Sequence, residues 1–467
     1  MHVPARSTHR RALALATALA FSVNGLALGA SNKGGAAWNI EVVGHSDLGG
    51  RGFNADVWFH DGIAYVGSWG FPDWASGTKD RFCPDSPGNG IAVVDATDPA
   101  NPVLVSRLPS PDGTSAEDVV VFEAEFGSLA GRDIAAAGIQ TCKGDGYDTS
   151  IERGLQLWDV TDPANPVEVG FWDSECCARG VHEFEIQHRP DLGRTFAYAS
   201  VPGSHYEDIL SPSGYEDQDG DGDFRLIDIT NPGAPFQASQ WSIQDIGGPW
   251  SDGIGCEPFE NYGHGAEPSA DGKTVFVSYW DAGFIKLDVS DPANPVFEGR
   301  TTYPGDADGQ AHSSQWDEGG ELLFANDEDF CKTAGSATEK GFGYMRVYDF
   351  SDPANPVQIG EYKTPNASGS TDVTGGDYSI HNNWLSDTDI YSSWYTDGVR
   401  VIDASDPTEP VEVAYFVPPA GQNPVKPSMR SVLSNNVQVW GVVVDEASGL
   451  IYASDMNSGL WILRRTD

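Results

Sequence analysis

Four histidines of this chain stand in similar short contexts, each just ahead of a segment in which polar and apolar residues alternate. They are His182 in GVHEF, His264 in YGHGA, His312 in QAHSS and His381 in SIHNN. In the aligned segments elsewhere, the same place is taken by Ala55, Glu117 and Trp440. Neutral imidazoles that gather at one point suit copper, iron, zinc or nickel, because nitrogen donors bind borderline metals well. If the aligned positions converge, we expect a metal site held by the four histidines, with Glu117 completing it.

A second interpretation of these histidines stays open on the sequence alone. A polar residue that recurs in a repeat often bonds the neighbouring repeat or a water, and this role needs no metal. In the metal interpretation, Glu183 and Asp118 would accept hydrogen bonds from the rings and orient them. The expected ion is then copper or iron, with zinc less favoured.

The histidine segments belong to a larger repeat, whose most regular part reads GIAVVDATDPANPV from Gly90. Five further copies start at Gly154, Asp223, Gly283, Tyr344 and Gly398, and a shortened one, GLWILRRTD, ends the chain. Each copy predicts a strand, an Asp-Pro turn and a second strand, since proline cannot lie inside a ladder. A second hairpin precedes each copy, and two hairpins form the four-stranded blade of a β-propeller.

One aspartate ends the first strand of every full copy. These residues are Asp95, Asp159, Asp228, Asp288, Asp349 and Asp403. We expect their carboxylates to accept hydrogen bonds from backbone amides of the turn. A role in every blade is architectural, because a catalytic residue is needed only once.

The two ends of the chain predict how the ring closes. Residues 36–48 resemble the last strand of a repeat, whereas the C-terminus supplies only the first three strands of one. Together they make a single blade without exposed sheet edges. The predicted fold is therefore all-β: a seven-bladed propeller, closed by the N-terminal strand joining the C-terminal blade.

The recurring phrase, with its β-branched strand, Asp and Ser/Thr-Asp-Pro turn, resembles the LVIVD-repeat family over nearly the whole chain. The resemblance implies a secreted or surface propeller and no single activity. Four imidazoles from four blades are similar in arrangement, though not in sequence, to the iron site of carotenoid-cleaving oxygenases and to the histidine-lined channel of selenium-binding propellers.

Insertions in the repeats fall on one face of the predicted ring. They occupy residues 70–89, 140–153, 201–222, 242–263, 327–341, 363–376 and 417–435. Insertions gathered on one face of a repeat protein mark the binding face, which we call the long-loop face. All six cysteines lie on the same face, namely Cys83, Cys142, Cys176, Cys177, Cys256 and Cys331. Of the possible disulfides, Cys83–Cys142 is favoured because both residues leave corresponding strands of neighbouring blades.

One insertion carries the acidic turn DQDGDGD. Asp217, Asp219, Asp221 and Asp223 supply oxygen donors at alternate positions, as in a calcium loop. The carboxylate at the twelfth position would be Asp228, which already belongs to the repeat, and no helices flank the turn. Calcium as a pin on this loop and a plain solvated turn both stay open.

The N-terminus and the charge indicate where the chain works. Residues 1–30 combine arginines, an apolar run and small residues, which predicts a secretory signal followed by a single propeller domain over 31–467. We expect a secreted, periplasmic or cell-surface monomer without a transmembrane segment. The formal net charge of −42 disfavours nucleic acid as a partner.

Three functions fit these patterns. The first is a propeller that binds a ligand or partner on the long-loop face, with or without a metal at the channel mouth. The second is a copper- or iron-dependent oxidoreductase that uses the histidine arc. The third is a surface adhesion or carbohydrate-binding module.

Overall fold

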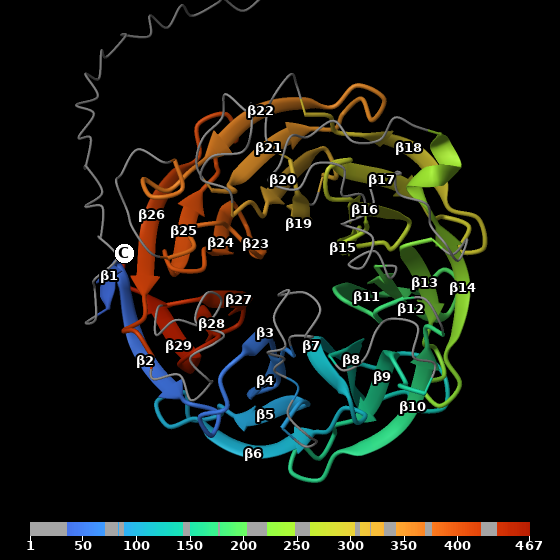
Figure 1. The fold of residues 1–467 in the computed structure, drawn as a ribbon, viewed down its shortest axis with the longest axis horizontal. Helices are drawn as coiled ribbons and strands as arrows, with labels where there is room; N and C mark the ends of the chain where they lie inside the picture. Colours follow the sequence, from blue (N-terminus) through green and yellow to red (C-terminus); the bar gives the residue numbers. More distant parts are fainter. Residues whose placement is uncertain are drawn as a thin grey trace, which may run out of the picture.

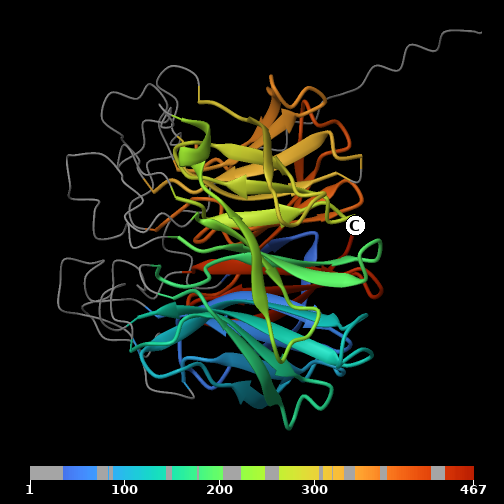
Figure 2. The ribbon, with the colours of Figure 1, turned by 90° about the vertical axis from the view of Figure 1, so that its right-hand side faces the viewer.

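A computed structural model describes residues 35–70, 83, 88–142, 150–175, 178–202, 222–247, 262–303, 309–317, 319–330, 342–368, 376–421 and 437–467. These residues form antiparallel sheets, mostly of four strands, arranged around a common centre (Figure 1). Viewed from the side, the strands run across the width of the ring from one face to the other (Figure 2). The all-β propeller expected from the repeats is confirmed.

Three sheets contain four strands each, in chain order. They are β11 (Phe184–Arg189), β12 (Arg194–Ser200), β13 (Phe224–Asp228) and β14 (Phe236–Trp241); β15 (Gly265–Pro268), β16 (Thr274–Ser278), β17 (Phe284–Asp288) and β18 (Val296–Arg300); and β19 (Ala311–Trp316), β20 (Leu322–Asp327), β21 (Met345–Asp349) and β22 (Val357–Tyr362). A short 3-10 helix, Ile243–Ile246, follows β14.

One eight-stranded sheet consists of two such units. They are β3 (Asn54–His60), β4 (Ile63–Ser68), β5 (Ile91–Asp95) and β6 (Val103–Leu108), and then β7 (Thr114–Glu123), β8 (Asp133–Thr141), β9 (Gly154–Asp159) and β10 (Val167–Asp173). A single pair, Ser68 with Ala116, joins the two units between β4 and β7.

The two remaining sheets both take a strand from the N-terminal segment. One contains β23 (Asn383–Ser386), β24 (Asp389–Ser393), β25 (Val399–Asp403), β26 (Val411–Val417) and the added β1 (Ala36–Trp38). The other contains β27 (Val439–Asp445), β28 (Leu450–Asp455), β29 (Gly459–Arg465) and β2 (Ile40–Ser46).

The N-terminal segment is therefore two strands, not the single strand expected over residues 36–48. Between them Asn39 takes a left-handed φ of 54°, which asparagine tolerates better than most residues. Its side-chain amide donates to Val413 O over 2.9 Å, and its carbonyl accepts from Thr466 N over 3.0 Å. Asn39 thus switches the chain from the outer edge of one sheet to that of the next.

The repeat aspartates take the architectural role expected for them. Each carboxylate accepts a hydrogen bond from the backbone amide two residues ahead, for example Thr97 N to Asp95 at 3.0 Å and Ser290 N to Asp288 at 2.8 Å. The same bond recurs at Asp159, Asp228, Asp349 and Asp403. These bonds fix the turn between the two outer strands of each unit.

Four of these six turns then pack against the neighbouring sheet through a glycine. An added Cβ at Gly44 in β2 would overlap with the carbonyl oxygen of Pro99 in the turn after β5. Gly170, Gly299 and Gly360 meet the carbonyls of Pro232, Pro353 and Pro407 in the same way. The proline of the repeated phrase therefore both bends the turn and approaches the backbone of the adjacent outer strand.

Apolar side chains between neighbouring sheets form the core. One cluster joins Val401 and Phe416 of one sheet to Val442 and Ile451 of the next, and other clusters repeat this arrangement around the ring. Within the described ranges, no helix is long and apolar enough to cross a membrane.

The glycine contact yields a stability prediction. Gly44→Ala should lower the free energy of unfolding by about 1–3 kcal/mol, because the methyl group forces β2 away from the turn at Pro99. Gly233→Ala is the control, since its added Cβ would lie at an ordinary 3.4 Å from Val169 O. Thermal unfolding of both variants tests this, and equal midpoints would contradict close packing of β2 against the turn.

Candidate metal centre

The innermost strands bring the four histidines together in chain order. His182 and His264 precede β11 and β15, His312 lies in β19, and His381 precedes β23. These strands lie closest to the centre of the ring in Figure 1. Successive ring centroids are 4.2, 3.8 and 4.2 Å apart, and Nε2 of His182 lies 2.7 Å from Nε2 of His264. The aligned positions therefore do form one continuous arc.

β-bulges lie at the start of four inner strands, β3, β7, β19 and β27, at the level of the arc. In β19, Ala311 pairs with Asp327 and Ser313 with Asn326, so that His312 is the extra residue. Trp440 takes the same place in β27. Likewise Ser393 is the single residue opposite both His381 and Asn382. Its carbonyl accepts from His381 N and its amide donates to Asn382 O, each over 2.9 Å. A bulge redirects a side chain out of the regular alternation of a strand, and no residue pattern in the sequence signals it.

Two carboxylates, Glu328 and Glu183, lie beside the arc at His312, whereas the alignment suggested Glu117. Glu328 Oε2 lies 3.3 Å from His312 Nε2, and Glu183 Oε1 lies 3.9 Å from the same atom. Donor atoms of His264, His312 and Glu328 lie within 4.8 Å of one another, as do those of Glu183, His312 and His381. Each set contains two imidazoles and one carboxylate.

Glu117 has a different position from the one expected. Its Oε2 lies 2.8 Å from Nδ1 of His182, so it faces the outer nitrogen of the first ring. Gln140 also contacts this nitrogen through its side-chain amide. We therefore assign Glu117 to orienting His182, because a carboxylate that accepts from Nδ1–H fixes the tautomer and leaves Nε2 without a proton for the arc.

His381 shows that the two interpretations of the recurring histidines are compatible. Its Nδ1 donates to the carbonyl of Trp440 in the next inner strand over 2.8 Å. The ring thus bonds the neighbouring sheet, and its Nε2 remains an acceptor. His312 differs from it, because among the described residues neither of its ring nitrogens has a hydrogen-bond partner, although it is 0% exposed.

Burial controls the protonation of the cluster. It lowers the pKa of His264 to about 3 and holds the pKa values of His182, His312 and His381 well below the ordinary value. Burial raises the pKa of Glu117 to about 7, and that of Glu328 well above its ordinary range. Without a bound cation the imidazoles are therefore neutral. A bound cation would favour the ionised form of these carboxyl groups and would therefore release their protons.

A cavity of about 310 Å³ adjoins the arc. Aromatic side chains, including Trp69, Tyr395 and Trp440, line it together with the histidines and Arg179. The Tyr395 hydroxyl donates to Glu328 Oε1, which positions that carboxylate at the arc. The cavity is large enough for a small organic molecule beside the donor atoms.

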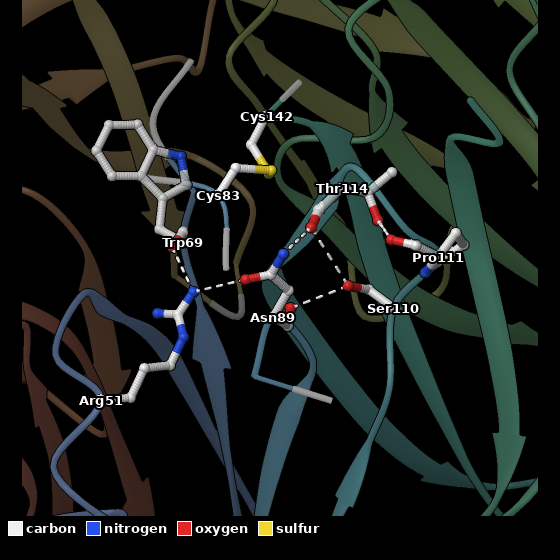
Figure 3. Close-up of a disulfide and its surroundings, with 8 residues drawn as sticks. All are labelled: Arg51, Trp69, Cys83, Asn89, Ser110, Pro111, Thr114 and Cys142. Atoms are coloured by element: carbon white, nitrogen blue, oxygen red, sulfur yellow. Dashed lines mark hydrogen bonds between the residues drawn. A yellow bond between two sulfur atoms is a disulfide. The ribbon is translucent and has the colours of Figure 1, made fainter. Parts of the chain in front are cut away.

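The wall at Trp69 is braced by a disulfide and a polar network (Figure 3). Cys83 and Cys142 are bonded, with their Cα atoms 5.5 Å apart, which confirms the favoured pair. Nearby, Nη2 of Arg51 donates to Trp69 O over 2.9 Å and to Asn89 Oδ1 over 3.2 Å. The other cysteines, Cys176, Cys177, Cys256 and Cys331, lie outside the described residues.

The predicted calcium turn is described only at its last donor. Asp217, Asp219 and Asp221 lie outside the described residues, whereas Asp223 accepts a hydrogen bond from Gly263 N over 2.9 Å. Asp228 contacts Arg194 at 2.8 Å and Thr230 N at 2.9 Å at the far end of β13. It serves the turn of its repeat, as expected.

Comparison with known proteins bears on the repeats alone. The LVIVD repeat family model matches residues 87–109 and 267–302, which cover β5 with β6 and the strands β16 to β18. The chain carries LVIVD repeats. No curated protein matches this LVIVD-repeat chain significantly. Among solved structures, it is similar to the β-propeller domain of Cps50 (Swd1) from Myceliophteria thermophila, with 12% identity over 92% of this chain and 99% of that one. The TM-score is 0.46, and this likeness carries no argument about the site.

The shifted imidazoles predict a pH dependence of the chelator-treated protein. A histidine whose folded pKa lies below the unfolded value stabilises the fold above about pH 6.5, and this contribution is lost as the pH falls toward 3. Each such group contributes a slope of about 1.4 kcal/mol per pH unit. The variant His264→Asn/His312→Asn should therefore lose less stability than the wild type between pH 6 and pH 4.

Denaturant unfolding at a series of pH values measures these slopes. His45→Asn is the control, because His45 is an exposed residue of the outer strand β2, with its ring centroid 4.0 Å from that of Trp461. An identical slope in the wild type and the double variant would show that the buried rings are not neutral in the fold.

Proposed function

We propose that this protein binds a first-row transition-metal ion at the mouth of its channel and a small ligand in the adjoining cavity. The observation that carries the proposal is His312, a fully buried imidazole between two other histidines, with both ring nitrogens unsatisfied among the described residues. Leaving a buried nitrogen without a hydrogen bond is costly, and a metal ion would satisfy the nitrogen of His312 that carries no proton. Binding would then take place on the long-loop face, where the sequence places the insertions.

The donor sets favour iron over copper and zinc. Two histidines and one carboxylate with open positions suit non-haem iron(II), and both His264–His312–Glu328 and Glu183–His312–His381 have this composition. A bound iron ion would supply Lewis-acid and redox chemistry next to the cavity. The residues of the chain would hold the ion, orient the rings through Glu117 and Trp440 O, and exclude water with aromatic walls.

The second candidate function, a metal-dependent oxidoreductase, is favoured by the same cavity. An enzyme needs an open site where substrate meets the metal, and about 310 Å³ beside the arc provides that space. A pure binding protein would use the cavity without turnover. Substrate screening on iron-loaded protein separates these two functions.

We also propose that the ring has seven blades and that the chain is exported. Dividing the eight-stranded sheet at the pair Ser68–Ala116 gives seven units of four strands, and β2 pairs with β29 to close the last. Export is supported by the signal pattern in residues 1–30 and by the Cys83–Cys142 bond, since disulfides persist in oxidising compartments. The calcium turn stays a proposal for the loop before β13.

The metal site predicts the behaviour of a double variant. Protein dialysed against iron(II) without chelator should retain near-stoichiometric iron, and His264→Ala/His312→Ala should lose at least nine-tenths of it, because both donor sets need His312. Elemental analysis by mass spectrometry measures the content, and circular dichroism checks the fold.

His188→Ala is the matched control. This ring lies near the C-terminal end of β11, away from the arc, and contacts Thr195 Oγ1 at 2.9 Å. It should retain the iron of the wild type. Full metal content in the double variant, or none in the wild type, would refute the site.

A further inference from the structure

A layer of carboxylates lies directly below the histidine arc. Asp56, Asp118 and Glu183 stand one residue further along their inner strands than the arc position, and Glu185 and Glu267 stand three residues further. All five line one cavity of about 70 Å³ in the channel. No lysine or arginine is among the described residues that line it. Five acidic groups thus share a confined space without a basic partner.

The described hydrogen bonds hold these carboxylates in place without neutralising them. Asp118 accepts from Val119 N over 2.7 Å and from Phe184 N over 2.9 Å. Asp56 accepts from Val57 N over 2.8 Å and from the Asn382 amide over 2.7 Å. Burial raises the pKa of Asp56 to about 7 and of Glu267 to about 8, which is the cost of keeping charge in this space.

Ser314 is a second, independent indication of a ligand. It lines the same cavity and is 6% exposed, and its Oγ has no hydrogen-bond partner among the described residues. Asn382 also lines the cavity, and its Oδ1 likewise lacks a described partner. Hydroxyl and amide oxygens join carboxylates in the coordination of hard cations.

We propose that this layer binds a hard divalent cation, calcium in preference to a transition metal. Every polar donor is an oxygen atom, and the donors come from several separate strands, which suits the flexible six- to eight-fold coordination of calcium. The volume admits the ion with one or two waters, since a water occupies about 30 Å³ in the liquid. The site is distinct from the arc, although Glu183 lies between the two and reaches within 3.6 Å of His264 Nδ1.

Terbium(III) luminescence tests the proposal, because terbium replaces calcium and is excited by nearby tryptophan. Trp58 and Trp384 line the same cavity, with ring centroids 5.8 Å apart. The full chain carrying Asp217→Asn/Asp219→Asn/Asp221→Asn, which removes the acidic turn as a competing site, is treated with chelator and titrated with terbium. We expect sensitised emission that saturates and that calcium displaces.

Two variants in that background locate the ion. Glu185→Gln/Glu267→Gln should weaken terbium binding by at least about tenfold, since two charged donors are lost. Ser314→Ala, a smaller change, should weaken it several-fold and tests the site even if the double variant unfolds. Loss of emission on removing the acidic turn alone, or unchanged affinity in both channel variants, would overturn the proposal.

His264→Ala/His312→Ala separates this proposal from the transition-metal site. If the channel site exists, this variant keeps the terbium response whether or not the wild type binds iron. Emission that disappears with the two histidines would assign the ion to the arc and contradict a separate oxygen-donor site.

Discussion

The inner strands of the ring converge on one axis, and every other feature of the site depends on that constraint. A residue position that recurs along the sequence becomes a layer of side chains around the channel, so histidines separated by 82, 48 and 69 residues, from His182 through His264 and His312 to His381, become neighbours. The β-bulges at the same position add the local geometry, because they turn the side chains of the layer inward. Architecture and chemistry are thus set by the same repeat.

Burial then decides what each layer can hold. The upper layer is rich in imidazoles that are neutral when enclosed, and these suit borderline metals. The lower layer contains only oxygen donors among its polar groups, which suit a hard cation. Glu183 connects the two layers, with one carboxylate facing both His264 and His312. A strongly acidic chain, at −42, also raises the local concentration of cations at the channel.

The sequence predicted those parts of the protein that repeat. Alignment of the copies placed His182, His264, His312 and His381 at one level, and the turn aspartates such as Asp95 were correctly given a structural role. Corresponding positions in neighbouring blades also identified the Cys83–Cys142 pair. In each case the spacing within the repeat carries the information.

Features that occur once could not be predicted in this way. Glu328 follows β20 at the start of an insertion and has no counterpart in the other copies, so its contact with His312 depends on the fold of one loop. Glu117 occupies the aligned position, yet its carboxylate meets the outer nitrogen of His182, and nothing in the alignment indicates this orientation. The division of the N-terminal segment at Asn39 depends on one left-handed residue between two sheets.

The most direct test of the histidine site is X-ray absorption spectroscopy at the iron edge of the iron-loaded full chain. The described donor sets predict a first shell of nitrogen and oxygen at about 2.0–2.2 Å, with the outer-shell scattering that imidazole rings produce. A shell of oxygen atoms alone, without imidazole scattering, would place the metal elsewhere and contradict a transition-metal site at the histidine arc.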